Sequence, residues 1–152
     1  MKKITLILIL IAFPGYSQIE DILIGEWKAT AINRDNIFYN SENDSISVNL
    51  DSNFPIESLQ VLRIAMKVSI SDKQYFFNDV NELKCVIAPG FEIILIYEIV
   101  KEEKLINLYE KDKNQTSVGN IEYQFNCSDL ELKMTIKEES SSYLILEKVK
   151  PF

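Results

Sequence analysis

The sequence of 152 residues contains no histidine, which rules out several common kinds of site. Ser-His-Asp triads, Cys-His pairs and histidine-ligated metal centres all need an imidazole as base or ligand. The two cysteines alone do not supply the four ligands of a structural zinc site. The carboxylate pairs Glu102-Glu103 and Glu138-Glu139 fall in expected turns, so nothing predicts that they face one another across a cleft. We therefore expect a protein that is not an enzyme and that has no metal or cofactor.

Basic residues are also scarce, with 16 Lys and Arg against 23 Asp and Glu and a net charge of −7. Proteins that bind nucleic acid carry a basic patch, and anionic lipid surfaces attract basic segments. The acidic balance therefore argues against both kinds of partner. It is typical of a domain whose charge keeps it soluble.

Long hydrophobic runs are restricted to the N-terminus. Met1-Lys2-Lys3 precedes an almost unbroken apolar run over residues 4–13, and small residues follow up to Ser17. This order is that of a secretory signal peptide, and the run is shorter than the about 20 residues that a membrane-spanning helix needs. We expect a signal peptide over residues 1–17 and one exported domain over residues 18–152, periplasmic or secreted, with no membrane span in the mature chain. Cleavage removes two lysines and no acidic residue, which takes the net charge from −7 to −9.

After the signal peptide, the chain alternates between short strand-like segments and turns. The clearest pattern places Leu62, Ile64, Met66, Val68 and Ile70 on one face, which predicts a long half-buried strand. Further strand-like segments cover residues 25–34, 46–50, 75–77, 83–88, 91–100, 105–109, 121–126, 130–136 and 143–149. Short connections favour antiparallel neighbours, because parallel crossovers need longer segments. The pattern predicts an all-β barrel or sandwich of about eight to ten strands, with no long helix.

A Gly-x-Trp motif, formed by Gly25 and Trp27, opens the first of these strands. In its position within an exported chain, it resembles the start of the lipocalins, and more closely that of lipocalin-like domains of exported bacterial proteins. The resemblance implies an up-and-down antiparallel β-barrel, often around an apolar ligand, in which Gly25 and Trp27 form the barrel floor. Lipocalins usually carry an arginine near the last strand that packs on this tryptophan. Neither arginine of this chain lies there, so Lys148 or Lys150 would have to take its place.

The two cysteines, Cys85 and Cys127, both fall on the inward face of their expected strands. In an oxidising compartment a disulfide between them is possible, and its loop would add about 4 kcal/mol of stability in the chain-entropy model. Two strands that lie several places apart would hold the cysteines too far apart for a bridge. The sequence leaves open whether they form a disulfide or two buried thiols.

The inward positions suggest a function in binding. We expect the barrel to bind a small apolar or amphipathic molecule at its open end, against Leu62, Ile64, Met66, Tyr97, Tyr123 and Phe125. An alternative is a non-catalytic barrel or sandwich with a filled core, used as an interaction or envelope accessory module. The sequence does not specify the ligand, the oligomeric state, or whether the barrel has eight or ten strands.

Overall fold

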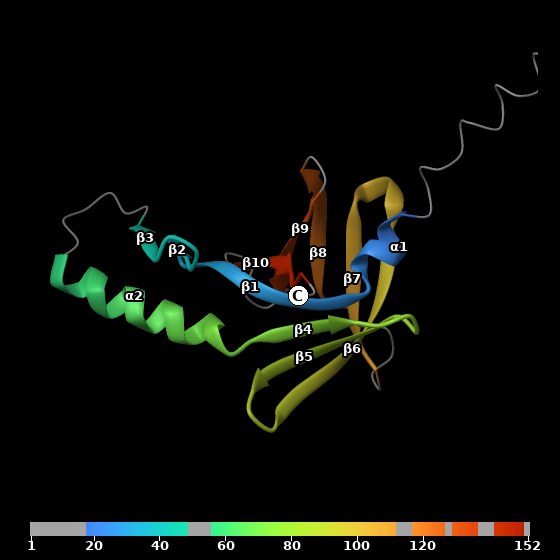
Figure 1. The fold of residues 1–152 in the computed structure, drawn as a ribbon, viewed down its shortest axis with the longest axis horizontal. Helices are drawn as coiled ribbons and strands as arrows, with labels where there is room; N and C mark the ends of the chain where they lie inside the picture. The colour runs from blue at the N-terminus through green and yellow to red at the C-terminus, as the bar shows by residue number, and fades with distance from the viewer. Residues whose placement is uncertain (1–17, 49–55, 112–116, 127–128, 137–141, 151–152) are drawn as a thin grey trace, which may run out of the picture.

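A closed barrel of antiparallel strands dominates the structure (Figure 1). The structure is a computed structural model, and it describes residues 18–48, 56–111, 117–126, 129–136 and 142–150. The strands are β1 (Gly25–Arg34), β2 (Ile37–Asn40), β3 (Ser45–Val48), β4 (Gln74–Phe77), β5 (Glu82–Ala88), β6 (Phe91–Val100), β7 (Leu105–Glu110), β8 (Ser117–Asn126), β9 (Asp129–Ile136) and β10 (Tyr143–Lys148). The helices are α1 (Gln18–Leu23), α2 (Ile56–Ser71) and the 3-10 turn η1 (Lys101–Glu103). The predicted signal peptide lies outside the described residues.

Eight strands close the barrel in the order β1-β4-β5-β6-β7-β8-β9-β10, and β10 pairs back with β1. All these pairings are antiparallel and, apart from the closure and the β1–β4 step, each joins strands that are consecutive in the chain. The predicted all-β barrel is thus confirmed, and it has eight strands. The hairpin β2–β3 and helix α2 are inserted between β1 and β4, and they extend to one side of the barrel (Figure 1).

Strand β1 makes this arrangement possible because different parts of it pair with different neighbours. One edge pairs with β10 over residues 27–33. The other edge pairs first with β4, over residues 25–28, and then with β2, over residues 31–34. The register shifts between Ala29 and Ala31, and such a bulge bends a strand. The second half of β1 therefore leaves β4 and carries the inserted hairpin.

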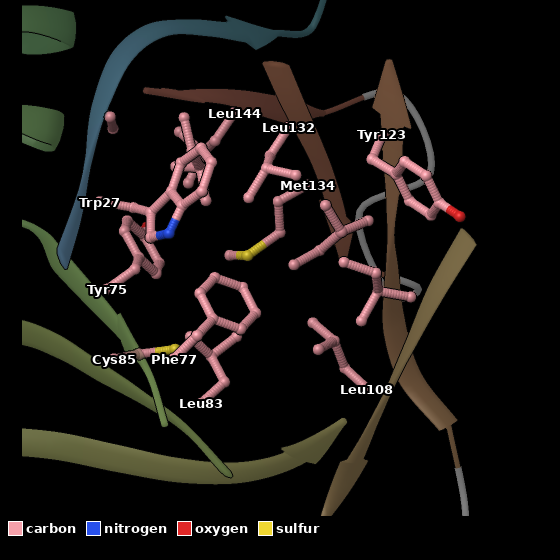
Figure 2. Close-up of a cluster of buried hydrophobic side chains, with 14 of the residues drawn as sticks. Trp27, Tyr75, Phe77, Leu83, Cys85, Leu108, Tyr123, Leu132, Met134 and Leu144 are labelled. Atoms are coloured by element: carbon pink, nitrogen blue, oxygen red, sulfur yellow. The ribbon is translucent and has the colours of Figure 1, made fainter. Parts of the chain in front are cut away.

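The inner face of the barrel is filled with apolar side chains through its middle. Figure 2 shows this cluster, in which Trp27, Phe77, Leu83, Leu132 and Met134 point toward one another from opposite walls. Fully buried members of the core are Leu23, Trp27, Tyr39, Leu83, Ile106, Leu108, Ile121, Leu132 and Leu146. The alternation that predicted the strands therefore also identified most inward positions correctly.

The prediction of a long strand over residues 62–70 is wrong, because this segment forms α2, and so is the prediction that no long helix follows the signal peptide. Met66 and Ile70, four residues apart, lie on one helix face and are only 6% and 2% exposed. Ile64 and Val68 shared a face with them in the predicted strand, but they are 59% and 67% exposed. The apolar residues of this segment fit both the two-residue spacing of a strand and the four-residue spacing of a helix, so the pattern alone did not distinguish the two. Packing of α2 against β1, β2 and β3 is compatible only with the helical period.

Polar contacts hold α2 on the inserted hairpin. The Asp44 carboxylate accepts a hydrogen bond of 2.9 Å from the Tyr39 hydroxyl. It also forms ion pairs of 3.4 Å with Arg63 and Lys67 of α2. We call β2, β3 and α2 together the inserted arm.

Within the described ranges, neither helix combines the length and hydropathy that a bilayer span requires.

The helical assignment predicts opposite outcomes for two isoleucines of α2. Ile70→Ala should lower the free energy of unfolding by about 2–4 kcal/mol, because it empties a buried site. Ile64→Ala should change it by less than about 0.5 kcal/mol, because its side chain is already exposed. Urea unfolding of both variants measures this difference. A strand would place both residues on one face, so equal losses would contradict the helix.

Candidate ligand-binding site

The two ends of the barrel differ in how they are covered. Helix α1 lies at the end where β1 begins and β6 finishes, and Glu20 of α1 forms an ion pair of 2.6 Å with Lys101 of η1. Ile19 and Leu23 of α1 are buried in the core. We call this the closed end, and we call the opposite end, where β6 begins and β7 finishes, the mouth.

Trp27 is the centre of the closed end. Its side chain is fully buried, and its indole N–H donates a hydrogen bond of 2.8 Å to the carbonyl of Leu23. Lys148 is paired with Trp27 across the β1–β10 closure, and its Nζ lies 6.0 Å from the centroid of the indole ring. The same ammonium group donates a hydrogen bond to the carbonyl of Ile22. Lys148 thus joins the first strand, the last strand and α1.

Gly25 leaves the room that Lys148 needs. A Cβ atom at Gly25 would lie 3.2 Å from Cε of Lys148, closer than most such contacts allow. The φ angle of Gly25 is +131°, in a region that other residues rarely adopt. The Gly-x-Trp motif therefore works together with the lysine of the last strand. Between Lys148 and Lys150, Lys148 is the residue that packs on the tryptophan.

Three of the predicted ligand-binding residues, Tyr97, Tyr123 and Phe125, lie toward the closed end. The Tyr97 hydroxyl donates a hydrogen bond of 2.8 Å to the carbonyl of Asn78, in the turn after β4, and burial raises the pKa of this tyrosine. The backbone N–H of Tyr123 bonds to the carbonyl of Lys104 at 3.0 Å. The Tyr123 and Phe125 rings meet edge to face with centroids 6.3 Å apart. In Figure 2 the Tyr123 hydroxyl points away from the buried cluster.

The other three, Leu62, Ile64 and Met66, lie on α2 and not on a barrel strand. Their assignment to the barrel wall depended on the strand prediction and is corrected with it. The six residues therefore do not form one surface.

A surface hollow of about 270 Å³ lies beside Tyr123, and its other lining residues are mostly charged. They are Glu103, Lys104, Glu122, Gln124, Glu131 and Lys133. Lys133 and Glu122 form an ion pair of 3.4 Å within it. Such a lining does not match an apolar ligand, which needs mainly hydrophobic walls.

The mouth carries an apolar wall whose residues were not among the six predicted ligand-binding residues. Cys85 pairs with Ile93, so both side chains lie on the inner face, and Phe91 follows on the same face two residues away. Cys85 is 6% exposed, whereas Ile93 is 40% and Phe91 58% exposed. With Leu95, these residues form what we call the mouth wall. Counting alternate residues back from Tyr97 would have placed Phe91 and Ile93 on the inner face, but not at the mouth.

Cys85 has a free, buried thiol, whose pKa burial raises to about 12. Its strand neighbour Tyr75 has a raised pKa as well, mainly through burial and secondly through Cys85. Cys127, the other member of the possible disulfide, lies outside the described residues. No group of three His, Cys, Asp or Glu side chains that could hold a metal occurs in the described part of the chain.

Comparison with known proteins supports the fold. The structure is similar to the crystal structure of a DUF4847 family protein from Bacteroides vulgatus ATCC 8482, with a TM-score of 0.54 and 11% sequence identity. The similarity covers 88% of this chain and 98% of that protein. Neither a protein-family model nor a curated protein matches the sequence. At this identity the similarity shows the barrel fold alone.

The closed end predicts unequal effects for the two C-terminal lysines. Lys148→Met should lower the free energy of unfolding by about 1–3 kcal/mol, because it removes the partner of the Ile22 carbonyl and a cation over the indole. Lys150→Met, at an exposed position, should change it by less than about 0.5 kcal/mol. Thermal unfolding of the two variants provides the comparison. Similar losses would show that Lys148 does not hold the closed end together.

The buried thiol predicts a loss of stability at alkaline pH. The folded state raises the pKa of Cys85 from 9.0 to about 12, so its contribution is complete below pH 9 and decreases as the pH rises toward 12. In a Cys127→Ser background, unfolding free energy should fall between pH 8 and 10 by about 1.5 kcal/mol more with Cys85 than with Cys85→Ala. Urea titrations at both pH values measure it. Parallel decreases in the two proteins would mean that the thiol is not buried.

Proposed function

We propose that this protein is an exported, non-catalytic carrier that binds a small apolar or amphipathic molecule at the mouth of its barrel. The observation that carries the proposal is the exposure of Phe91 and Ile93, 58% and 40%, on the inner face of the barrel. Soluble proteins usually expose a group of apolar side chains where something binds, and ligand sites combine such walls with a concave scaffold. Burial of this wall would contribute about 25 cal/mol per Å² of apolar surface.

The filled middle of the barrel supports a ligand position at the mouth. Trp27, Leu83, Ile106 and Leu132 are fully buried, and they occupy the interior between the mouth and α1. An apolar molecule would therefore lie against the mouth wall, with the filled core beneath it. The ligand site that we expected from Tyr97, Tyr123 and Phe125 is moved to the other end of the barrel.

Three further parts of the proposal rest on the sequence and the closed end. Export is supported by the signal-peptide pattern of residues 1–17, and cleavage after Ser17 would leave α1 intact, with Ile19 and Leu23 in the core. A lipocalin-like origin is supported by the Gly25, Trp27 and Lys148 arrangement. A non-catalytic role is supported by the lack of histidine.

A second candidate function is the interaction module, and an exposed stripe on α2 favours it. Val61, Ile64 and Val68 recur at spacings of three and four residues and are 67%, 59% and 67% exposed. An apolar stripe with this period is how a helix packs against a partner. In this alternative the barrel is a scaffold for the inserted arm, and the mouth binds nothing.

Two exposed phenylalanines at opposite ends of the barrel test the carrier function. Phe91→Ala should weaken binding of the neutral fluorescent probe N-phenyl-1-naphthylamine by at least about 10-fold, because it removes the most exposed part of the mouth wall. Phe125→Ala, which truncates a ring that is 48% exposed at the closed end, should change it by less than about twofold. Fluorescence titration gives both dissociation constants, and because both rings are largely exposed we expect both variants to fold, which circular dichroism checks.

Two other outcomes would contradict this expectation. Weaker binding with Phe125→Ala alone would move the site to the hollow beside Tyr123. No binding of the probe to the parent protein would overturn the carrier function and favour the interaction module.

A further inference from the structure

We propose that the mouth selects its ligand by the length of the apolar part, and that it fits a single unbranched chain of about eight to ten carbons. This inference rests on the proposed carrier function and adds the size class of the ligand. Its basis is the depth of the exposed apolar surface on β6 above the filled core.

The exposure of the inward side chains of β6 decreases from the mouth to the middle of the barrel. Phe91 is 58% exposed and Ile93 40%, whereas Leu95 is half-buried and Tyr97 is only 4% exposed. Alternate residues of a strand share a face, so these four side chains form one column on the inner face. A tail that enters at Phe91 therefore covers Ile93 next and reaches Leu95 last.

Buried side chains of β5 close the lower end of this column. Cys85, paired with Ile93, is 6% exposed, and Leu83, paired with Leu95, is fully buried. Figure 2 shows Leu83 beside Phe77, within the cluster that fills the middle of the barrel. Closely packed side chains leave little free volume for a further part of the ligand. The apolar surface that a ligand can cover therefore ends near Leu95.

The column is also narrow. On one side of β6, the row through Ile93 continues to Cys85 and then to Tyr75 of β4, which is 4% exposed. On the other side, Leu95 is paired with Glu110, a polar residue at the end of β7. Along these four strands, the exposed apolar column is therefore one strand wide, and a single chain covers it.

Strand geometry gives the length of the column. The four residue steps from Phe91 to Leu95 cover about 13 Å along the strand, at about 3.3 Å per residue. A strand tilt of about 35–45° reduces this length to about 10 Å along the barrel axis. Carbon–carbon bonds of about 1.5 Å at angles of about 111° advance an extended chain by about 1.25 Å per carbon. The column therefore matches about eight to ten carbons, and a polar head group stays in water at the mouth.

A series of unbranched alcohols, hexanol, octanol, decanol and dodecanol, tests this length. Each alcohol would compete with N-phenyl-1-naphthylamine at concentrations below its solubility limit. The affinity should rise by about fourfold per methylene up to about eight to ten carbons, because each buried methylene contributes a similar transfer free energy. Dodecanol should then bind within about threefold of decanol, because its additional carbons remain outside the column.

Two neighbouring isoleucines with nearly equal exposure provide a matched pair of variants. Ile93, on the inner face, is 40% exposed, and Ile94, paired with Lys84 on the outer face, is 39% exposed. Ile93→Trp fills the lower half of the column, so the rise in affinity should end at hexanol. Octanol and decanol should therefore bind this variant at least about 10-fold more weakly than the parent protein. Ile94→Trp should leave all four affinities within about twofold.

Other outcomes overturn different statements. A rise that continues at about fourfold per methylene from decanol to dodecanol would overturn the length limit and leave the carrier function standing. The same result would follow if Ile93→Trp bound the series as the parent protein does, or if both variants lost affinity equally. Circular dichroism checks that both variants fold, and the parent series alone decides the length if one does not. If neither the probe nor any alcohol binds the parent protein, the carrier function itself fails.

Discussion

The packing of Lys148 on Trp27 is the interaction on which the rest of the structure depends. A meander of strands becomes a barrel only when the first and last strands pair, and Trp27 and Lys148 face one another across that closure. The Trp27 indole and the Lys148 ammonium bond to two successive residues of α1, Leu23 and Ile22. The two residues that face one another where the sheet closes therefore also hold α1 over one end of the barrel. Gly25 permits Lys148 to lie there because glycine has no side chain that would meet the lysine.

The two ends of the barrel are built differently. The apolar layers above Trp27 are closely filled, whereas the inner face at the mouth presents the exposed apolar side chains of Phe91 and Ile93. The inserted arm pairs with β1 over residues 31–34, beyond the bulge and away from Trp27. The fold therefore combines a closed end, built on Trp27, with an opposite end where apolar side chains are exposed, and the proposed carrier function uses this second end.

The sequence predicted which face of a strand each residue occupies, but it did not predict the end of the barrel at which that residue lies. Alternation correctly placed Tyr97 and Tyr123 inside the barrel, and both are buried. Their position along the axis depends on strand tilt and on the cross-strand register, which no single strand encodes. The same limit explains why Ile93 was not recognised as a mouth residue. Only the pairing of β6 with β5 and β7 shows at which end of the barrel it lies.

The failure at α2 has a different cause. In that segment the apolar residues satisfy the two-residue period of a strand and also the helical spacing that joins Met66 to Ile70. The local pattern did not distinguish a helix from a strand. Packing against β1, β2 and β3 selected the helix. At the Gly25-x-Trp27 motif, the sequence left Lys148 and Lys150 open as the residue near the tryptophan, and the pairing of β1 with β10 brings Lys148 to it.

The most direct test of a barrel with one closed and one binding end is a crystal structure of the protein soaked with 1-bromodecane. Anomalous scattering from bromine locates this neutral apolar molecule without any assumption about its pose. We predict a bromine peak within van der Waals contact of Phe91 or Ile93. A peak beside Tyr123 at the closed end, or well-ordered crystals without bromine anywhere along the inner face, would contradict the account.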